Sequence, residues 1–313
     1  MKAIFMGTPD FAVPCLERLI DIGVDVTAVF TQPDKPVGRG YKLTPPPVKI
    51  SAENHKITVY QPEKLKTPEK EKLIESLEPD IIFVVAYGKI LSQKILDIPK
   101  LGCINIHGSL LPLYRGSSPI QYSVLNGDKI TGVTSMYMDA GMDTGDIIMQ
   151  IKTPIGENET SGELFDRLSA IGADCIEKTV ESIENGSFTR TKQDESKATY
   201  TKILDKGMSF TAFDDSAQNV HNKIRGLSPW PCATAELNGT KMKLFSSVIV
   251  EKESQNAKSF GKLLNDKRFI VSCKTGSVEI LSVQAEGSKR MSGEEFLRGK
   301  RLKTGTEFDK KEK

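Results

Sequence analysis

The chain has 313 residues, of which 38% are hydrophobic and 27% are charged, and its formal net charge is +2. This length favours about two domains of ordinary globular composition. No apolar run approaches the roughly 20 residues that a membrane-spanning helix needs. The five cysteines form no CxxC pair, so neither a disulfide framework nor a cysteine zinc site is predicted, and we expect a cytoplasmic protein.

The first half of the chain alternates short β-branched segments with helix-length segments. This pattern predicts an α/β domain, a Rossmann-like parallel sheet covered by helices. The expected strands are 2–6, 24–30, 57–60, 81–85, 103–107, 132–138 and 147–151. After the first strand, Thr8 is the expected N-cap of a helix that ends at Gly23. The turn has no GxGxxG motif, so a dinucleotide site is not predicted.

A second domain is predicted after a polar connection. A helix over 161–183 closes the first domain, and helix 216–225 precedes strands at 233–237, 242–250, 268–273 and 277–284. Their regular spacing predicts a small β-barrel of OB-like topology. We therefore divide the chain into 1–189, a linker at 190–205, and 206–313. Trp230 is the only tryptophan, and we expect it to anchor the core of the second domain.

Charge is unevenly divided between the two parts. Residues 206–313 contain 20 Lys and Arg against 13 Asp and Glu, a net charge of +7, whereas residues 1–205 contain 23 against 28. A basic second part predicts contact with a polyanion such as nucleic acid. The alternative is an ordinary basic tail, because Lys310, Lys311 and Lys313 supply three of these charges.

A long connection rich in proline and glycine spans residues 33–49. It carries one acidic residue, four basic residues and a tyrosine: Asp34, Lys35, Arg39, Lys42, Lys49 and Tyr41. A basic segment with an aromatic side chain suits phosphates and an unstacked base. A mobile, solvated loop is the alternative.

Three polar residues follow predicted strands in loops rich in glycine and proline. Asn105 and His107 share one strand and one side of it, and Asp143 lies within Asp139–Asp146. An imidazole can exchange a proton near neutral pH, an amide can donate to an oxyanion, and a carboxylate can orient the imidazole and stabilise its charged form. This set predicts transfer of an acyl group onto an amine at the carboxyl edge of the sheet.

Other chemistries have weaker signals. Ser109 lies near His107 but has no GxSxG context, and no HExxH or paired-ligand spacing predicts a metal. The segment 84–91 leaves a strand, and its turn exposes backbone groups that suit the edge of a flat heterocycle. Ordinary strand-to-helix packing explains this segment equally well.

Five segments, spread in order along nearly the whole chain, resemble the methionyl-tRNA formyltransferases. They are Gly7-Thr8-Pro9-Asp10-Phe11-Ala12, the loop 33–49, Asn105-Ile106-His107-Gly108-Ser109-Leu110-Leu111-Pro112, Asp139–Asp146 and Ser228-Pro229-Trp230-Pro231. The Asn-x-His and Asp set is common to formyltransferases that use 10-formyltetrahydrofolate. The basic loop and basic second domain are more specific to the tRNA enzymes. Gly116-Ser117-Ser118-Pro119 departs slightly from the family's Gly-Ala-Ala-Pro.

The resemblance implies transfer of the formyl group of 10-formyltetrahydrofolate to the α-amino group of methionine on initiator tRNA, for translation initiation. Asn105 would donate to the oxyanion, and His107 would take part in proton transfer. Asp143 would hold His107 and relay a proton through water to the departing folate nitrogen. The group that removes the first amine proton is left unassigned.

The resemblance also implies binding residues. The folate pocket would be lined by Ala86, Tyr87, Gly88, Ile90, Leu91, Ser109, Leu110, Leu111, Pro112 and Asp139. Lys35, Arg39 and Lys42 would bind tRNA, and Arg39 would enter an acceptor end whose first base pair is weak. No metal is implied, and we expect a monomer.

Two other functions stay open on the sequence. One is a formyltransferase with a small acceptor, such as glycinamide ribonucleotide or a nucleotide amino-sugar, although such an acceptor needs neither the basic loop nor the basic domain. The other is a non-catalytic RNA-binding protein on the same scaffold, which the intact Asn105, His107 and Asp143 disfavour.

Overall fold

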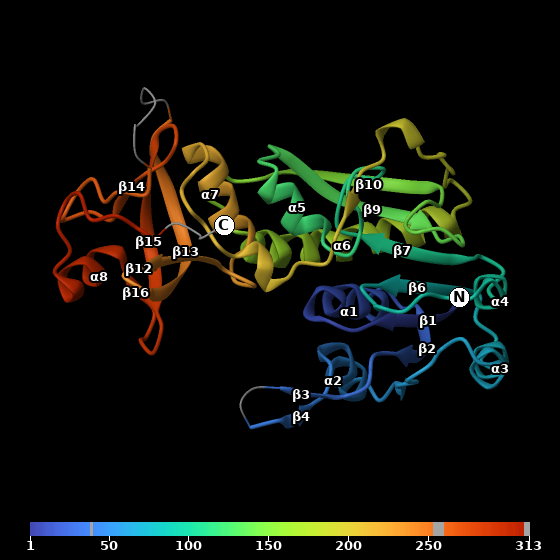
Figure 1. Ribbon diagram of the computed structural model, residues 1–313. Helices are drawn as coiled ribbons and strands as arrows, with labels where there is room; N and C mark the ends of the chain where they lie inside the picture. Colours follow the sequence, from blue (N-terminus) through green and yellow to red (C-terminus); the bar gives the residue numbers. More distant parts are fainter. Residues whose placement is uncertain (38–39, 253–259, 310–313) are drawn as a thin grey trace. The chain divides into compact units, whose positions relative to one another are not determined.

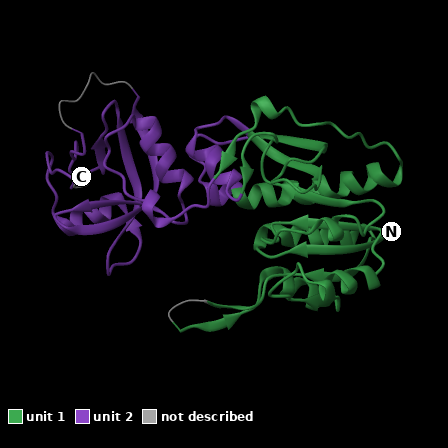
Figure 2. Cartoon of the chain, turned by 45° about the vertical axis from the view of Figure 1, so that its right-hand side comes forward, with its two compact units in different colours: residues 1–116, 131–153, 165–201 green, residues 117–130, 154–164, 202–313 purple. Residues whose placement is uncertain are grey.

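The computed structural model describes residues 1–37, 40–252 and 260–309 (Figure 1). The chain forms two compact units (Figure 2). The first contains residues 1–116, 131–153 and 165–201, and the second contains 117–130, 154–164 and 202–313. Within the described ranges, every helix is too short or too polar to cross a membrane.

A seven-stranded sheet forms the centre of the first unit, in the order β10-β9-β7-β6-β1-β2-β5. In chain order its strands are β1 (Lys2–Gly7), β2 (Asp25–Phe30), β5 (Thr58–Tyr60), β6 (Ile81–Val85), β7 (Cys103–His107), β9 (Ile130–Tyr137) and β10 (Ile147–Pro154). These are the seven predicted strands. The pairs from β5 to β7 are all parallel, as predicted.

One strand breaks the parallel pattern. β9 pairs with β7 in the antiparallel direction, with Asn105 opposite Met136 and His107 opposite Thr134. A parallel return from β7 would need a crossover helix packed on the sheet. The helix between these strands, α5 (Pro119–Leu125), belongs instead to the second unit. The sheet is therefore mixed.

Helices cover both faces of this sheet. On one face, α1 (Val13–Asp21) packs against α2 (Pro47–Asn54) and against α6 (Ser161–Glu184), where a Cβ on Gly172 would lie 3.3 Å from Cys15 Sγ. On the other face, α3 (Pro68–Ser76) and α4 (Gln93–Leu96) close a core that includes Ile4, Ile74 and Ile95. Because both faces are covered, β1 and β6 read as nearly continuous apolar runs.

Thr8 does not cap a helix, which corrects the sequence-based expectation. A short 3-10 turn, η1 (Asp10–Ala12), precedes α1, and Pro14 lies in the first turn of that helix. The Thr8 hydroxyl donates to the Tyr87 carbonyl at 3.0 Å and accepts from the Gln32 amide at 3.4 Å. Thr8 thereby joins the carboxyl ends of β1, β2 and β6.

The order of the strands makes those ends a candidate ligand site. In the sheet, β2 lies on one side of β1 and β6 lies on the other side. The direction in which successive strands are added therefore reverses at β1. The carboxyl ends of strands at such a reversal are the usual ligand sites of open α/β sheets. Segment 86–91 begins at this point, directly after β6.

The described part of the connection 33–49 contains secondary structure that was not predicted. It contains an antiparallel hairpin of β3 (Lys35–Val37) and β4 (Lys42–Thr44), and α2 begins at Pro47. The Lys49 ammonium donates to Asp34 at 3.0 Å and to Gln61 at 2.9 Å, so it is engaged within the fold. Arg39 lies outside the described residues.

The second unit, for which the strand spacing predicted a small OB-like β-barrel, is built on an antiparallel sheet. Its five strands follow the order β12-β13-β15-β14, with β16 paired to β15. The elements are α7 (Ala217–Gly226), β12 (Ala233–Leu237), β13 (Thr240–Glu251), β14 (Ile270–Ser272), β15 (Ser277–Ala285), β16 (Met291–Ser292) and α8 (Gly293–Lys300). A capping box between Ser292 and Glu295 begins α8.

Trp230 is not a core anchor, and the prediction that placed it there was wrong. It lies in the connection between α7 and β12, and 56% of its surface is exposed. Four phenylalanines fill the core instead, because Phe213 and Phe269 pack on Phe308 and Phe269 stacks on Phe296 at 5.5 Å. The core leaves the indole in contact with solvent.

A buried histidine should make the second unit sensitive to acid. His221 Nε2 donates to the Glu157 carbonyl and Nδ1 accepts from the Ser247 hydroxyl, both at 2.9 Å. Burial lowers the pKa of His221 below its ordinary value of 6.5. The unfolded chain therefore binds this proton more strongly, and stability falls as pH drops below about 6.5.

Replacing His221 by glutamine should remove this component. We expect the free energy of unfolding of His221→Gln to fall less than that of the unmodified chain between about pH 7 and pH 5. Urea titrations at both pH values measure the difference, and contributions from the other titrating groups cancel in it. Equal losses in both proteins would contradict the assignment.

Candidate functional site

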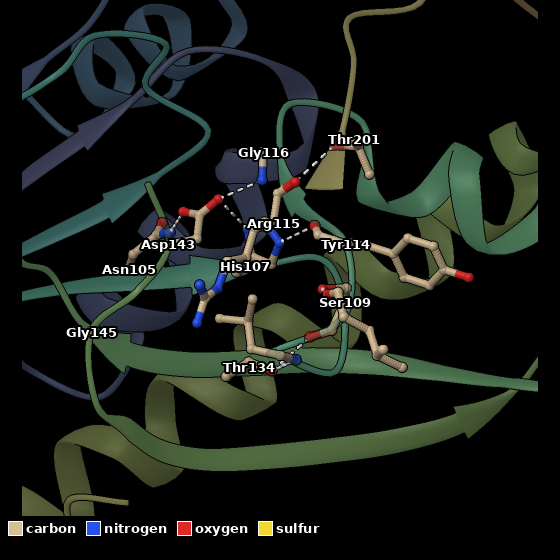
Figure 3. A network of polar contacts seen from close by, with 12 residues as sticks. Asn105, His107, Ser109, Tyr114, Arg115, Gly116, Thr134, Asp143, Gly145 and Thr201 are labelled. Carbon is tan, nitrogen blue, oxygen red and sulfur yellow. Dashed lines mark hydrogen bonds and ion pairs between the residues drawn. The ribbon is translucent and has the colours of Figure 1, made fainter. Parts of the chain in front are cut away.

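The three residues predicted to act together do converge. Asn105 and His107 lie at the carboxyl end of β7 on the same side, and Asp143 lies in the connection between β9 and β10 (Figure 3). Asn105 Nδ2 is 3.5 Å from Asp143 Oδ1, and His107 Nδ1 is 3.8 Å from Asp143 Oδ2. Positions 105 and 107 coincide in direction because side chains alternate along a strand.

A backbone carbonyl orients the imidazole of His107. The ring is buried, and its Nε2 lies 3.0 Å from the carbonyl oxygen of Tyr114. A carbonyl only accepts hydrogen bonds, so Nε2 carries a proton. In the neutral ring the lone pair is then on Nδ1, the nitrogen that faces Asp143. A second proton taken at Nδ1 would meet a carboxylate, which stabilises the imidazolium.

The carboxylate of Asp143 is held by the backbone of the neighbouring loop. Its Oδ2 accepts from the amide of Gly116 at 2.7 Å. Asp143 has φ of +54°, in the left-handed region, which aspartate tolerates better than most residues. A Cβ at Gly145 would lie 1.8 Å from the Tyr137 carbonyl oxygen, so only glycine allows this path of the loop.

A buried arginine connects the Asp143 loop to a segment much later in the chain. Arg115 is fully buried, and its guanidinium donates to both carboxylate oxygens of Glu195 at 2.7 and 2.8 Å. The same group donates to Gln193 Oε1 at 2.8 and 3.1 Å. Gln193 Nε2 in turn donates to the carbonyls of Asp143 and Gly145, each at 2.8 Å.

Backbone pairing completes this connection. β8 (Arg115–Gly116) pairs with β11 (Tyr200–Thr201), and the Arg115 amide donates to the Thr199 carbonyl at 2.8 Å. The Tyr114 amide donates to the Thr199 hydroxyl at 2.8 Å. Residues 191–201, part of the predicted linker, therefore hold the loop that supplies Tyr114 and Gly116 to the site.

Sequence reasoning missed Arg115, Gln193 and Glu195. One signal was present, because Arg115 lies in the largely apolar stretch Leu110–Gly116, and a buried charge requires a partner. The partner could not be identified from the sequence, since Glu195 is 80 residues away. The Arg115 guanidinium lowers the pKa of the Glu195 carboxyl and is the largest cause of that shift.

The turn after β6 exposes part of the predicted folate set. Ala86 and Gly88 have φ of +47° and +76°, and both are exposed. Ile90 is 72% exposed, whereas Tyr87 and Leu91 are buried in the sheet core. The carbonyl of Tyr87 accepts from Thr8 and Gln32. The turn thus offers Ile90 and the backbone near Ala86 and Gly88 to a ligand.

The predicted residues after His107 shape the neighbouring loop. The Ser109 hydroxyl donates to the Leu113 carbonyl at 2.6 Å, and its carbonyl accepts from Thr134 at 2.6 Å. Ser109 is fully buried, which disfavours a nucleophilic role. Leu111 is also buried, and Leu110 and Pro112 are half-buried.

Asp139, the remaining residue predicted to line the folate pocket, is exposed. It accepts from the Gly141 amide at 3.0 Å and the Thr144 hydroxyl at 2.6 Å, so it orders the same loop as Asp143. Among the residues that the structure describes, no three His, Cys, Asp or Glu side chains are grouped as metal ligands.

Comparison with known proteins connects this geometry to a family. Residues 1–180 match the family model of formyl transferase, and residues 203–301 match that of the formyl transferase C-terminal domain. A methionyl-tRNA formyltransferase from Ruminiclostridium cellulolyticum is 44% identical over 312 residues, which cover 99% of this chain and 100% of the relative. One from Geobacter metallireducens is 47% identical over 305 residues, 97% of each chain.

A solved structure shares the fold. The N-formyltransferase from Helicobacter canadensis, in complex with folinic acid and dTDP-3-aminofucose, superposes with a TM-score of 0.68 at 23% identity and covers 90% of this chain and 98% of that one. Because the two methionyl-tRNA formyltransferases match it over nearly its full length, the chain belongs to the methionyl-tRNA formyltransferase family.

Proposed function

We propose that the chain transfers the formyl group of 10-formyltetrahydrofolate to the α-amino group of methionine on initiator tRNA. The product is N-formylmethionyl-tRNA for translation initiation, which implies a cytoplasmic location. Family membership supports the activity. The observation that carries the mechanism is the convergence of Asn105, His107 and Asp143 at the carboxyl edge of the sheet.

Asn105 supplies a hydrogen-bond donor for the transition state. When the amine attacks the formyl carbon, a new C–N bond forms and negative charge develops on the formyl oxygen. The Asn105 amide has two N–H groups, one of which points toward Asp143 at a long 3.5 Å. Donation to that oxygen from a fixed amide stabilises the charge as it develops.

His107 and Asp143 manage the proton. The attacking amine must lose a proton and the departing nitrogen must gain one, so the transfer requires no net proton. The free lone pair of the His107 ring lies on Nδ1, because Nε2 donates to the Tyr114 carbonyl. Asp143, 3.8 Å away, stabilises the imidazolium that forms when His107 holds the proton in transit, and water beside Asp143 can carry it onward.

The folate would bind at the strand reversal beside β1 and β6. This co-substrate supplies a formyl group on a nitrogen that can leave. The backbone of Ala86 and Gly88 and the exposed side chain of Ile90 fit the edge and face of a flat heterocycle. The walls of this pocket would be shaped by the remaining predicted residues: Tyr87, Leu91, Ser109, Leu110, Leu111, Pro112 and Asp139.

The β3-β4 hairpin would contact the tRNA. Lys35 and Lys42 are exposed on it, and so are Tyr41 at 80% and Leu43 at 66%. Exposed apolar surface beside lysines is typical of surfaces that bind phosphates and unstacked bases. Arg39 is proposed from the sequence alone.

The proposed domain division follows the sequence. It assigns catalysis to 1–189, the linker to 190–205 and a basic tRNA-binding domain to 206–313, in a monomer. The contacts of residues 191–201 with β8 give the linker a further part in supporting the site.

Substitutions at the three catalytic positions should separate chemistry from binding. Asn105→Ala, His107→Ala and Asp143→Asn should each lower kcat by about 100-fold or more, because each removes a group that acts at the reacting atoms. Affinity for tRNA should be nearly unchanged. Formyl-transfer kinetics and tRNA binding measure both, with His55→Gln, an exposed histidine paired to Glu17, as control. Near-normal turnover of the variants would end the catalytic assignment.

Gln193 should position Asp143 without touching a substrate. In Gln193→Glu the acceptor for Arg115 remains, but the donor to the Asp143 and Gly145 carbonyls becomes an oxygen. We expect kcat to fall by about 10- to 100-fold, since small displacements of catalytic groups are costly, while KM for tRNA is unchanged.

A neighbouring carboxylate provides the control for this change. Asp194 bonds Ser196 and Lys197 on the exposed side of the same segment, so Asp194→Asn should leave kcat intact. The thermal midpoint of Gln193→Glu checks that the fold is retained. An unchanged kcat in a folded Gln193→Glu protein would show that Gln193 does not position Asp143.

The choice of acceptor tests the function itself. The unmodified chain should formylate methionine-charged initiator tRNA and not methionine-charged elongator tRNA. Arg39→Ala and Lys42→Ala should lower kcat/KM for the initiator and reduce its salt dependence, because phosphate contacts release counterions. The KM for folate should be unaffected. Lys100→Ala, an exposed lysine near the amino edge of the sheet, is the control.

Two outcomes would redirect the proposal. No transfer to either tRNA, with folate still bound, would point to a small amine acceptor. An equal loss of folate affinity in the hairpin variants would give the hairpin a different role.

A further inference from the structure

The second unit contains a hollow of about 540 Å³ that none of the catalytic residues lines. Its walls include Lys206, Trp230, Lys241, Lys243, Gln284 and Glu286. Lys206 precedes α7 and Trp230 precedes β12. Lys241 and Lys243 lie on β13, Gln284 lies on β15, and Glu286 follows β15. Its volume is in the range of ordinary small-ligand sites.

The aromatic side chain that lines this hollow, Trp230, is unusual because it does not pack in a hydrophobic core. Trp230 is the only tryptophan in the chain, and it is 56% exposed. Exposing a large indole forgoes the favourable burial of its apolar area, which makes a binding role the natural explanation. The partly exposed ring lines the hollow together with lysine, glutamine and glutamate side chains.

The remaining walls carry an excess of positive charge. Lys241 and Lys243 alternate with the buried Met242 and Leu244 on β13, so both point to its outer side. Within the described part of the chain, Lys206, Lys241 and Lys243 form no ion pair, and Glu286 is the one acidic residue of the lining. Beside this row, the Arg290 guanidinium lies over the ring of Phe245 at 4.2 Å.

We propose that this hollow binds one unpaired nucleotide of an RNA, with its base stacked on Trp230 and its flanking phosphates beside Lys206, Lys241 and Lys243. An aromatic face with adjacent cations is how proteins hold unstacked bases, because stacking tolerates any base and cations meet the backbone. Glu286, the acidic residue of the lining, favours the amino edge of the base and disfavours a phosphate beside it. The inference rests on the proposed function, under which the RNA is the tRNA substrate.

The single tryptophan provides a direct measurement. Titrating initiator tRNA into the full-length protein should quench the fluorescence of Trp230, because a stacked base is a close quencher. Heparin is a polyanion without bases, so it should bind the lysines without quenching the fluorescence of Trp230. Quenching by tRNA and not by heparin supports stacking. No quenching by tRNA that is shown to be bound overturns it.

Variants separate stacking from charge. Trp230→Ala should weaken tRNA binding by about tenfold or more, whereas Trp230→Tyr should retain most of the affinity. Lys243→Ala should weaken binding and lower its salt dependence, and Lys300→Ala on α8 is the matched control for an exposed lysine. Trp230→Ala that binds tRNA like the unmodified protein overturns the proposal.

The outcomes also distinguish this proposal from the catalytic one. If the unmodified protein transfers formyl groups while Trp230→Ala has normal tRNA affinity, only the hollow is refuted. If quenching and the affinity loss are seen without any formyl transfer, the hollow stands and the proposed function fails.

Discussion

The geometry of the site depends on one buried guanidinium. A fully buried Arg115 can be tolerated only if its charge and its N–H groups find partners, and Glu195 and Gln193 supply them. The requirement draws residues 191–201 onto the loop 112–116, whose Tyr114 carbonyl orients His107 and whose Gly116 amide holds Asp143. The same Gln193 fixes the backbone around Asp143. A single charge therefore orders both of the groups that we propose to manage the proton.

The arrangement leaves one nitrogen of His107 for chemistry. Because Nε2 donates to a carbonyl, a proton in transit under the proposed function would be held on Nδ1, which lies 3.8 Å from the Asp143 carboxylate. Asn105, from the same strand, directs an amide to the same region. Under the proposed function, the carboxyl end of β7 would combine an oxyanion donor and a proton carrier.

The two units present different surfaces to a ligand. In the first, the strand reversal beside β1 and β6 exposes backbone and Ile90, which suits a flat heterocycle. In the second, an exposed indole and three lysines form a hollow suited to a nucleotide. The uneven charge of the chain, net +7 over residues 206–313, agrees with an anionic partner for this C-terminal part of the second unit.

The sequence by itself predicted the convergence of Asn105, His107 and Asp143, the seven strands of the first sheet and the strands of the second unit. Strand periodicity and the Asn105-x-His107 spacing are local, so they can be read along the chain. The antiparallel β9, the hydroxyl contacts of Thr8, the exposure of Trp230 and the partners of Arg115 were decided only by the tertiary structure. Each depends on which distant segments compete for the same space or the same charge, and no local pattern records that competition.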